Sequence, residues 1–291
     1  MDDLTMDLVR VCRRNRDGAY GTQNNRQRGL AAMAEELLEL GYRLPTAASL
    51  KPKHVEALVE KWLNEDKTDA SIRNRLTWLR WWAEKIGKPN VVSRDNAAYG
   101  VAERGEVTRN RAQVLDQSRL QAIESPHIQA SLLLQVAFGL RREEAIKFRP
   151  QVAMRADHIS LQGSWTKGGR SRTIPVTTLE QRQTLHHIAA LVQGQGSLIP
   201  PDLTYVEQLK RYEYQTHKAG LRNTHGFRHA YAQRRYQALT GLACPLAGGK
   251  TWKEMTTSER DADRAARRQI SAELGHGRLK ITDTYLGRAF Q

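Results

Sequence analysis

The chain of 291 residues carries 46 lysine and arginine residues against 31 aspartate and glutamate residues, a formal net charge of +15. This excess favours a polyanionic partner. The length suggests two domains of ~100 to 200 residues each. A hydrophobic content of 40% is enough to build a core in both, which excludes fibrous and wholly disordered classes.

Only two cysteines occur, Cys12 and Cys244, so neither a disulfide framework nor a cysteine-rich zinc site can be assembled. The most apolar stretch, residues 130–140, is shorter than the ~18 apolar residues that a membrane-spanning helix requires. The N-terminus is acidic where a secretory signal would be basic. We therefore expect a cytoplasmic protein without a membrane segment.

Apolar residues recur every three or four positions in three early segments, which predicts amphipathic helices. These segments are 26–40, 53–63 and 71–86, and Gly41 supplies a stop after the first. The pattern predicts an all-helical domain over residues 1–94.

Residues 95–112 lose this periodicity and predict a basic linker. The second domain, residues 113–291, contains helical patterns at 117–123, 129–140, 179–192, after Gly226, and at 256–274. Alternation across 158–176 around two glycines instead predicts a β-hairpin. Residues 1–100 hold 17 basic and 14 acidic residues, a net +3, and the remainder holds 29 and 17, a net +12. Most of the affinity for a polyanion should therefore lie in the second domain.

Four short segments each place cationic or proton-transferring side chains beside a glycine or a turn. They are residues 139–144, 166–169, 225–229 and 274–276, the last followed by Tyr285. Phosphoryl transfer without a metal needs guanidinium forks, a proton donor and a nucleophile. His225 and His229, four residues apart, lack the further ligands of a metal site, and no metal is expected.

The order of these segments resembles the tyrosine recombinase family, the phage-type integrases, over most of the chain. Gly139-Leu140-Arg141 with Glu144 resembles the family's first motif, a Gly-Leu-Arg followed three places later by an acidic residue. Residues 166–175 resemble the family's hairpin, which carries a lysine at its turn. The family's six active-site positions are matched, in order, by Arg141, Lys167, His225, Arg228, His276 and Tyr285.

The resemblance implies a role for each residue. Tyr285 would attack the scissile phosphate and form a covalent 3′-phosphotyrosine, which preserves the bond energy for religation without ATP. Arg141 and Arg228 would hold the nonbridging oxygens, with His276 as a further donor.

The remaining positions are assigned to proton transfer and support. Lys167 would protonate the leaving 5′-oxygen, and His225 would assist proton transfer at the tyrosine. Glu144 would orient Arg141.

The resemblance also implies a fold and partners. The expected fold is mainly α with a small β-hairpin or sheet (α+β), formed by a helical core-binding domain and a catalytic domain. The expected function is site-specific cleavage and rejoining of DNA that integrates, excises or resolves a mobile element, with no cofactor. The partners would be double-stranded DNA of the nucleoid, further copies of the chain in a synaptic tetramer, and an accessory DNA-bending protein.

Basic side chains outside the six positions are candidates for DNA contacts, against the alternative of ordinary solvated charges. They lie on the third early helix, in the linker and in the hairpin: Arg73, Arg75, Arg80, Lys85, Arg109, Arg111, Arg170 and Arg172.

The chain departs from the family pattern in two places. Arg228 and His276 lie 48 positions apart, longer than the family spacing, and we place an insertion at about residues 240–263. We expect a loop followed by added helix there, contacting DNA or a neighbouring subunit. The sequence also ends six residues after Tyr285, so exchange of a C-terminal tail between protomers is not expected.

Two alternatives share the same motifs. A type IB topoisomerase would use the same cleavage chemistry to relax supercoils, and a DNA-binding regulator would keep the scaffold without the chemistry. The complete set of site residues argues for activity.

Overall fold

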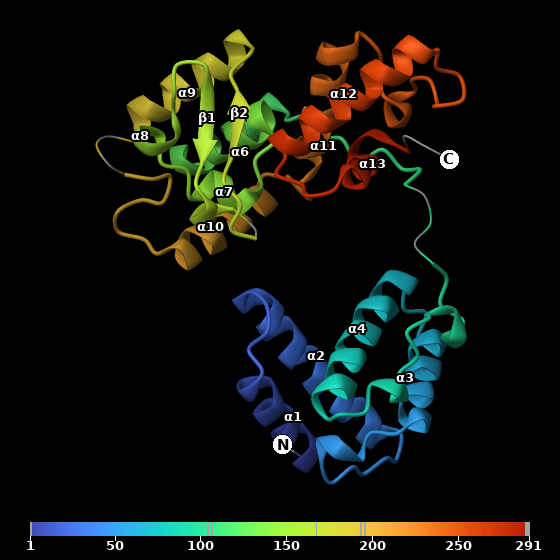
Figure 1. Cartoon of the computed structure of the whole chain (residues 1–291). Helices are drawn as coiled ribbons and strands as arrows, with labels where there is room; N and C mark the ends of the chain where they lie inside the picture. Colours follow the sequence, from blue (N-terminus) through green and yellow to red (C-terminus); the bar gives the residue numbers. More distant parts are fainter. Residues whose placement is uncertain are drawn as a thin grey trace. The chain divides into compact units, whose positions relative to one another are not determined.

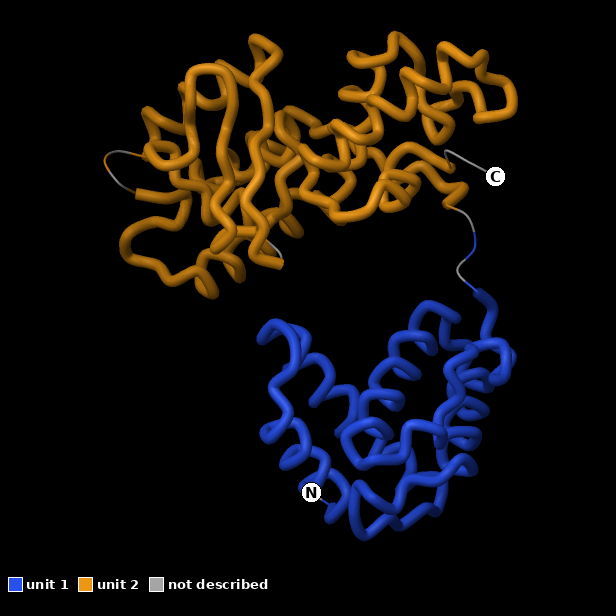
Figure 2. The backbone as a smooth tube through the Cα atoms, viewed as in Figure 1, with its two compact units in different colours: residues 1–105 blue, residues 106–291 orange. Residues whose placement is uncertain are grey.

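The computed structural model describes residues 2–103, 105, 107–166, 168–192, 194 and 196–288. It divides into two compact units, residues 1–105 and 106–291, which Figure 2 colours separately. This division falls inside the segment expected to be a linker. Helices dominate both units and a two-stranded antiparallel sheet lies in the second, which confirms the predicted fold class (Figure 1).

Unit 1 is helical throughout its regular elements. Its α-helices are α1 (Asp3–Arg14), α2 (Tyr20–Glu39), α3 (Pro52–Asn64) and α4 (Asp69–Lys85). Short 3₁₀ turns are η1 (Ala47–Ser49), η2 (Pro89–Val91) and η3 (Ala97–Tyr99). Helix α2 packs against α1, α3 and α4. The three predicted helices correspond to α2, α3 and α4, and α1 is an additional one.

The core of unit 1 is closed by two fully buried tryptophans, Trp62 and Trp82. Each indole satisfies its N–H: Trp62 Nε1 donates to Glu36 Oε2 at 2.7 Å, and Trp82 Nε1 donates to the Ala47 carbonyl at 3.0 Å. Burial of these large rings is a strong contribution to stability because no polar atom is left unpaired.

Unit 2 holds the hairpin and the remaining helices. Strands β1 (His158–Leu161) and β2 (Arg172–Pro175) pair with Ile159 opposite Ile174, both buried. The α-helices are α5 (Gln117–Gln121), α6 (Pro126–Phe138), α7 (Arg142–Ile146), α8 (Pro150–Ala153), α9 (Leu179–Leu191), α10 (Tyr205–Lys218), α11 (Gly226–Thr240), α12 (Thr257–Glu273) and α13 (Asp283–Leu286). The 3₁₀ turns are η4 (Gly163–Trp165), η5 (Pro245–Ala247) and η6 (Leu279–Thr282).

Helix α11 is central to unit 2 and packs against α6, α12 and α13 (Figure 1). Helix α6 ends at Gly139, whose φ of 62° lies in the left-handed region. A Cβ at Gly139 would come within 2.6 Å of the Tyr231 ring on α11, so the close approach of the two helices requires glycine. The chain therefore turns beside α11 immediately before Arg141.

The segment expected to be an insertion begins at Thr240, the last residue of α11, contains η5, and reaches into the first half of α12. It therefore consists of a loop followed by helix. Within the described part of the chain, no helix is both long enough and apolar enough to cross a membrane.

Candidate active site

Three local structures in unit 2 meet the segment that carries Tyr285. Arg141 caps the start of α7, His225 is the N-cap residue of α11, and Arg228 lies in the first turn of α11. His276 follows the end of α12, and Tyr285 lies on α13. Five of the six matched positions thus come from segments brought together around α11. Lys167, the sixth, lies outside the described residues.

Arg228 is fully buried and is the centre of the cluster. Its Nε donates to the Tyr285 hydroxyl at 3.3 Å, and its Nη1 donates to the Gly139 carbonyl at 2.5 Å. Nη2 contacts the Leu274 carbonyl and lies 3.4 Å from His276 Nε2. The guanidinium fork therefore links the ends of α6 and α12 to the tyrosine hydroxyl.

Three imidazoles surround the Tyr285 ring. The centroid distances are 4.6 Å for His229, 5.5 Å for His276 and 6.1 Å for His225. His229 is 3% exposed and its Nδ1 has no hydrogen-bond partner within the described structure. The sequence motifs did not indicate His229 as a residue of the site, although its place one turn after His225 was a usable signal.

Desolvation and nearby guanidinium charges keep these imidazoles neutral. Burial, followed by the charges of Arg228 and Arg141, lowers the pKa of His276 to about 3. Burial, followed by the nearby His225 and Arg111, lowers the pKa of His229 to about 4. Burial, followed by the charge of Arg228, also lowers the pKa of His225. At neutral pH each ring therefore offers one N–H donor and one acceptor nitrogen.

Arg141 is oriented by a buried carboxylate. Glu144 is 0% exposed and accepts from the Arg141 backbone N–H and from Arg141 Nη1, each at 2.8 Å. Arg172 contacts the same carboxylate through Nη1 at 3.0 Å and Nη2 at 2.7 Å. Burial opposes the charge of Glu144, but Arg172 and Arg141 outweigh burial and lower its pKa to about 2.

Arg172 differs from its expected role as a DNA-contacting side chain. It is 9% exposed, and its Nε donates to the Glu273 carbonyl at 2.8 Å. The reason is strand alternation, because Arg172 shares the inward face of β2 with Ile174. Period-two alternation in the sequence could have placed it there. We therefore assign Arg172 to holding Glu144 and, through it, Arg141.

The other candidates for DNA contact fall into two groups. Arg109, Arg111 and Arg170 are exposed. The four on α4 have partners inside unit 1: Arg73 with the Ala102 carbonyl, Arg75 with Glu36, Arg80 with Ser93 and Asn96, and Lys85 with Asp17. Any of these four that contacts DNA must share or exchange that partner.

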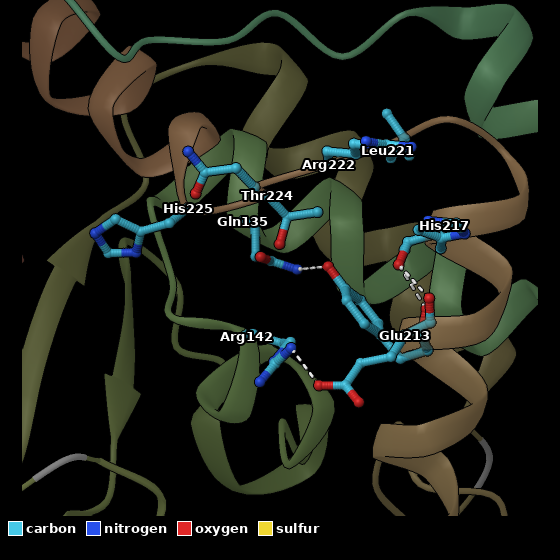
Figure 3. A pocket seen from close by; sticks show the side chains of 11 residues that line it. Gln135, Arg142, Glu213, His217, Leu221, Arg222, Thr224 and His225 are labelled. Atoms are coloured by element: carbon cyan, nitrogen blue, oxygen red, sulfur yellow. Dashed lines mark hydrogen bonds and ion pairs between the residues drawn. The ribbon is translucent and has the colours of Figure 1, made fainter. Parts of the chain in front are cut away.

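A cavity of about 510 Å³ adjoins His225 (Figure 3). It is lined by α6, α7, α10 and the loop before α11. Inside it Arg142 Nη1 lies 2.8 Å from Glu213 Oε1, and Gln135 Nε2 donates to the Tyr212 hydroxyl at 2.9 Å. Arg142, the neighbour of Arg141, thus has its own acidic partner. Within the described ranges no group of three or more His, Cys, Asp or Glu side chains could hold a metal ion.

The cluster has the parts that stabilise an anionic, five-coordinate phosphorus. The guanidinium of Arg228 donates to a phenolic hydroxyl that can act as nucleophile, and the neutral imidazole of His276 lies beside the Tyr285 ring.

Two family models match the sequence of the chain. A model of the phage integrase N-terminal domain matches residues 1–92, and a model of the integrase domain matches residues 102–234. No curated protein matches the chain in sequence.

Solved structures match nearly the whole chain at low identity. A lambda integrase dimer bound to a COC′ core site gives a TM-score of 0.65 at 17% identity, covering 99% of this chain and 79% of that one. The Tn1549 transposon integrase in complex with circular intermediate DNA gives 0.59 at 14%, covering 100% and 97%. The XerH recombinase bound to a palindromic difH substrate gives 0.58 at 16%, covering 97% and 80%. These matches establish a shared fold. The chain belongs to the tyrosine recombinase family, with the domains of the phage-type integrases.

Proposed function

We propose that this protein cleaves and rejoins DNA strands at a specific site through a covalent 3′-phosphotyrosine at Tyr285, and so integrates, excises or resolves a mobile element. The contact that carries the proposal is the hydrogen bond from Arg228 Nε to the Tyr285 hydroxyl at 3.3 Å, with His276 within 3.4 Å of the same guanidinium. A guanidinium so placed can bind the phosphate and the attacking oxygen together.

The chemistry proceeds by transesterification. The Tyr285 oxygen forms a bond to phosphorus, the bond from phosphorus to the 5′-oxygen breaks, and the tyrosine proton passes to His225. Lys167 gives a proton to the departing 5′-oxygen. Arg141, Arg228 and His276 stabilise the charge on the nonbridging oxygens, while Glu144 and Arg172 hold Arg141 in place. The reverse steps rejoin the strand, so no ATP is consumed.

The partners follow from this chemistry. Duplex DNA is the proposed substrate, and the proposal includes action in the cytoplasm, at the nucleoid. The matching structures include a lambda integrase dimer bound to a core site and a lambda integrase tetramer bound to a Holliday junction, and both support assembly of this chain on DNA as a homo-oligomer. The proposal includes a tetramer in the synaptic complex and an accessory DNA-bending protein as a further partner.

The test is trapping of a covalent adduct. Wild type, Tyr285→Phe and the control Tyr214→Phe are incubated with end-labelled DNA from the flanks of the encoding gene, with a chelator and without ATP. Tyr214 is 68% exposed, so its substitution controls for loss of a phenol. A denaturant-resistant adduct in wild type and Tyr214→Phe, absent in Tyr285→Phe, is expected. An adduct with Tyr285→Phe would refute the assignment, and site-independent relaxation of supercoiled DNA by the monomer would identify a topoisomerase instead.

A further inference from the structure

The segment that carries Tyr285 has little structure of its own. Helix α13 comprises four residues, Asp283–Leu286, between the 3₁₀ turn η6 and Gly287. One isolated helical turn is unstable, because fixing its backbone costs more entropy than its hydrogen bonds return. The position of Tyr285 must therefore come from groups elsewhere in unit 2.

One buried arginine on α12 bridges both ends of this turn. Arg267 is 0% exposed, and its Nη1 lies 3.2 Å from Asp283 Oδ1 and donates to the Gly287 carbonyl at 2.9 Å. Asp283 begins α13 and Gly287 follows it. A single guanidinium nitrogen thus connects the residues that flank Tyr285.

A buried carboxylate fixes the orientation of Arg267. Its Nε donates to both carboxylate oxygens of Asp263, each at 2.9 Å, and Asp263 is fully buried one helical turn earlier. Asp263 Oδ1 also accepts from the Tyr236 hydroxyl of α11 at 2.7 Å. Charged hydrogen bonds in such a low-dielectric site are strongly directional, so the fork has one orientation.

Residues of the segment 240–263 pack against α13 as well. Turn η5 packs against α13. A Cβ at Gly287 would come within 2.9 Å of Pro245 Cβ and 3.1 Å of the Leu246 nitrogen, so the backbone after α13 lies directly on η5. Cys244, Tyr285 and Leu286 are buried in one hydrophobic core.

We propose that Arg267 is a positioning residue for the nucleophile: oriented by Asp263, it fixes the turn of α13 against η5 and so keeps the Tyr285 hydroxyl within reach of Arg228. This inference rests on the proposed function of Tyr285. It gives residues 240–263 a role inside their own subunit, as a support for the tyrosine-bearing turn.

The first measurement separates cleavage from binding. Arg267→Met removes the fork, Asp283→Asn removes the negative charge of its partner at the start of α13, and Arg268→Met is the control, an exposed neighbour on the same helix. At saturating DNA, single-turnover adduct formation should slow on the order of 10-fold or more in Arg267→Met and Asp283→Asn, while Kd for DNA changes less than about 2-fold. Arg268→Met should cleave like wild type. Arg267→Lys should not restore the rate, because an ammonium group cannot reproduce the planar fork.

The second measurement needs no activity. Amide hydrogen exchange across residues 279–288 of the full-length protein should accelerate on the order of 10-fold in Asp283→Asn relative to wild type and Arg268→Met. Unchanged exchange together with an unchanged cleavage rate in Asp283→Asn would overturn the proposal, whether or not Arg267→Met folds. If wild type forms no adduct at all, the proposed function fails, and the exchange result alone decides whether Arg267 fixes α13.

Discussion

Single residues in this site combine deep burial with polar chemistry, and His229 is the clearest case. Its ring contacts the Tyr285 ring, and it is almost wholly buried without a partner for Nδ1. A charged imidazole there would lack both solvent and a nearby anion, so folding requires the neutral form.

This requirement predicts a pH-dependent stability. The pKa of His229 is about 4 in the folded protein against an ordinary 6.5, so the unfolded chain binds the proton first as the pH falls. The stability that His229 contributes is therefore complete above pH 6.5 and is lost as the pH falls towards 4. Between pH 7 and pH 5 the loss should be about 1 to 2 kcal/mol.

Urea unfolding of wild type and His229→Leu at both pH values checks this. The leucine variant should lose less stability on acidification than wild type by that amount. Equal losses in the two proteins would show that His229 does not titrate in this way.

Sequence patterns predicted the residues of the site better than their surroundings. The order and spacing of the motifs indicated Arg141, His225, Arg228, His276 and Tyr285, and the structure brings these five together. Arg172 and Arg267 were not recognised as buried supports, because an arginine in a strand or helix ordinarily faces solvent. Only the three-dimensional pairing of Arg267 with Asp263 and Asp283 explains its burial.

At the scale of elements, the junction of α6 and α11 depends on Gly139. Alanine at this position would be strained by the left-handed backbone and would also meet the Tyr231 ring. Gly241 is a matched control, since its φ is 72° but nothing lies within 4 Å of a Cβ there.

Thermal unfolding of the two alanine variants separates the effect of backbone strain from the effect of the steric clash with the Tyr231 ring. Gly241→Ala should lower the free energy of unfolding by about 1 kcal/mol, from backbone strain alone. Gly139→Ala should lower the free energy of unfolding by roughly 1 to 3 kcal/mol more, because the added methyl group overpacks the contact with the Tyr231 ring. Equal costs would show that the Tyr231 ring moves aside freely.

Among the described helices of more than ten residues, two escaped prediction, for different reasons. Helix α1 carries a usable signal, since Leu4, Leu8 and Cys12 are buried at helical spacing after the capping residue Asp2. Helix α10 buries Gln208, Tyr212, Gln215 and Thr216, a polar face that hydropathy does not detect. Its one local signal was the capping box of Thr204 with Glu207.

At the scale of the whole molecule, charge is concentrated in the second part of the chain. Affinity for duplex DNA should fall by about 0.9 log units per log unit of salt for each phosphate neutralised. Because Arg109 is exposed, Arg109→Gln should reduce that slope by about 0.9 if it contacts a phosphate. Fluorescence anisotropy over a range of salt measures the slope, and a flat dependence in wild type would contradict electrostatic binding.

Each unit has its own hydrophobic core. The buried cluster of unit 1 runs from Leu4 to Val101, and both described clusters of unit 2, with the hydrophobic residues packed against them, draw on residues after 114. A crossover between two genes within residues 102–112 would therefore cut through no described hydrophobic cluster. Evolution can in this way pair one helical unit with a different tyrosine-bearing unit, and the two parts of this chain can have separate ancestries.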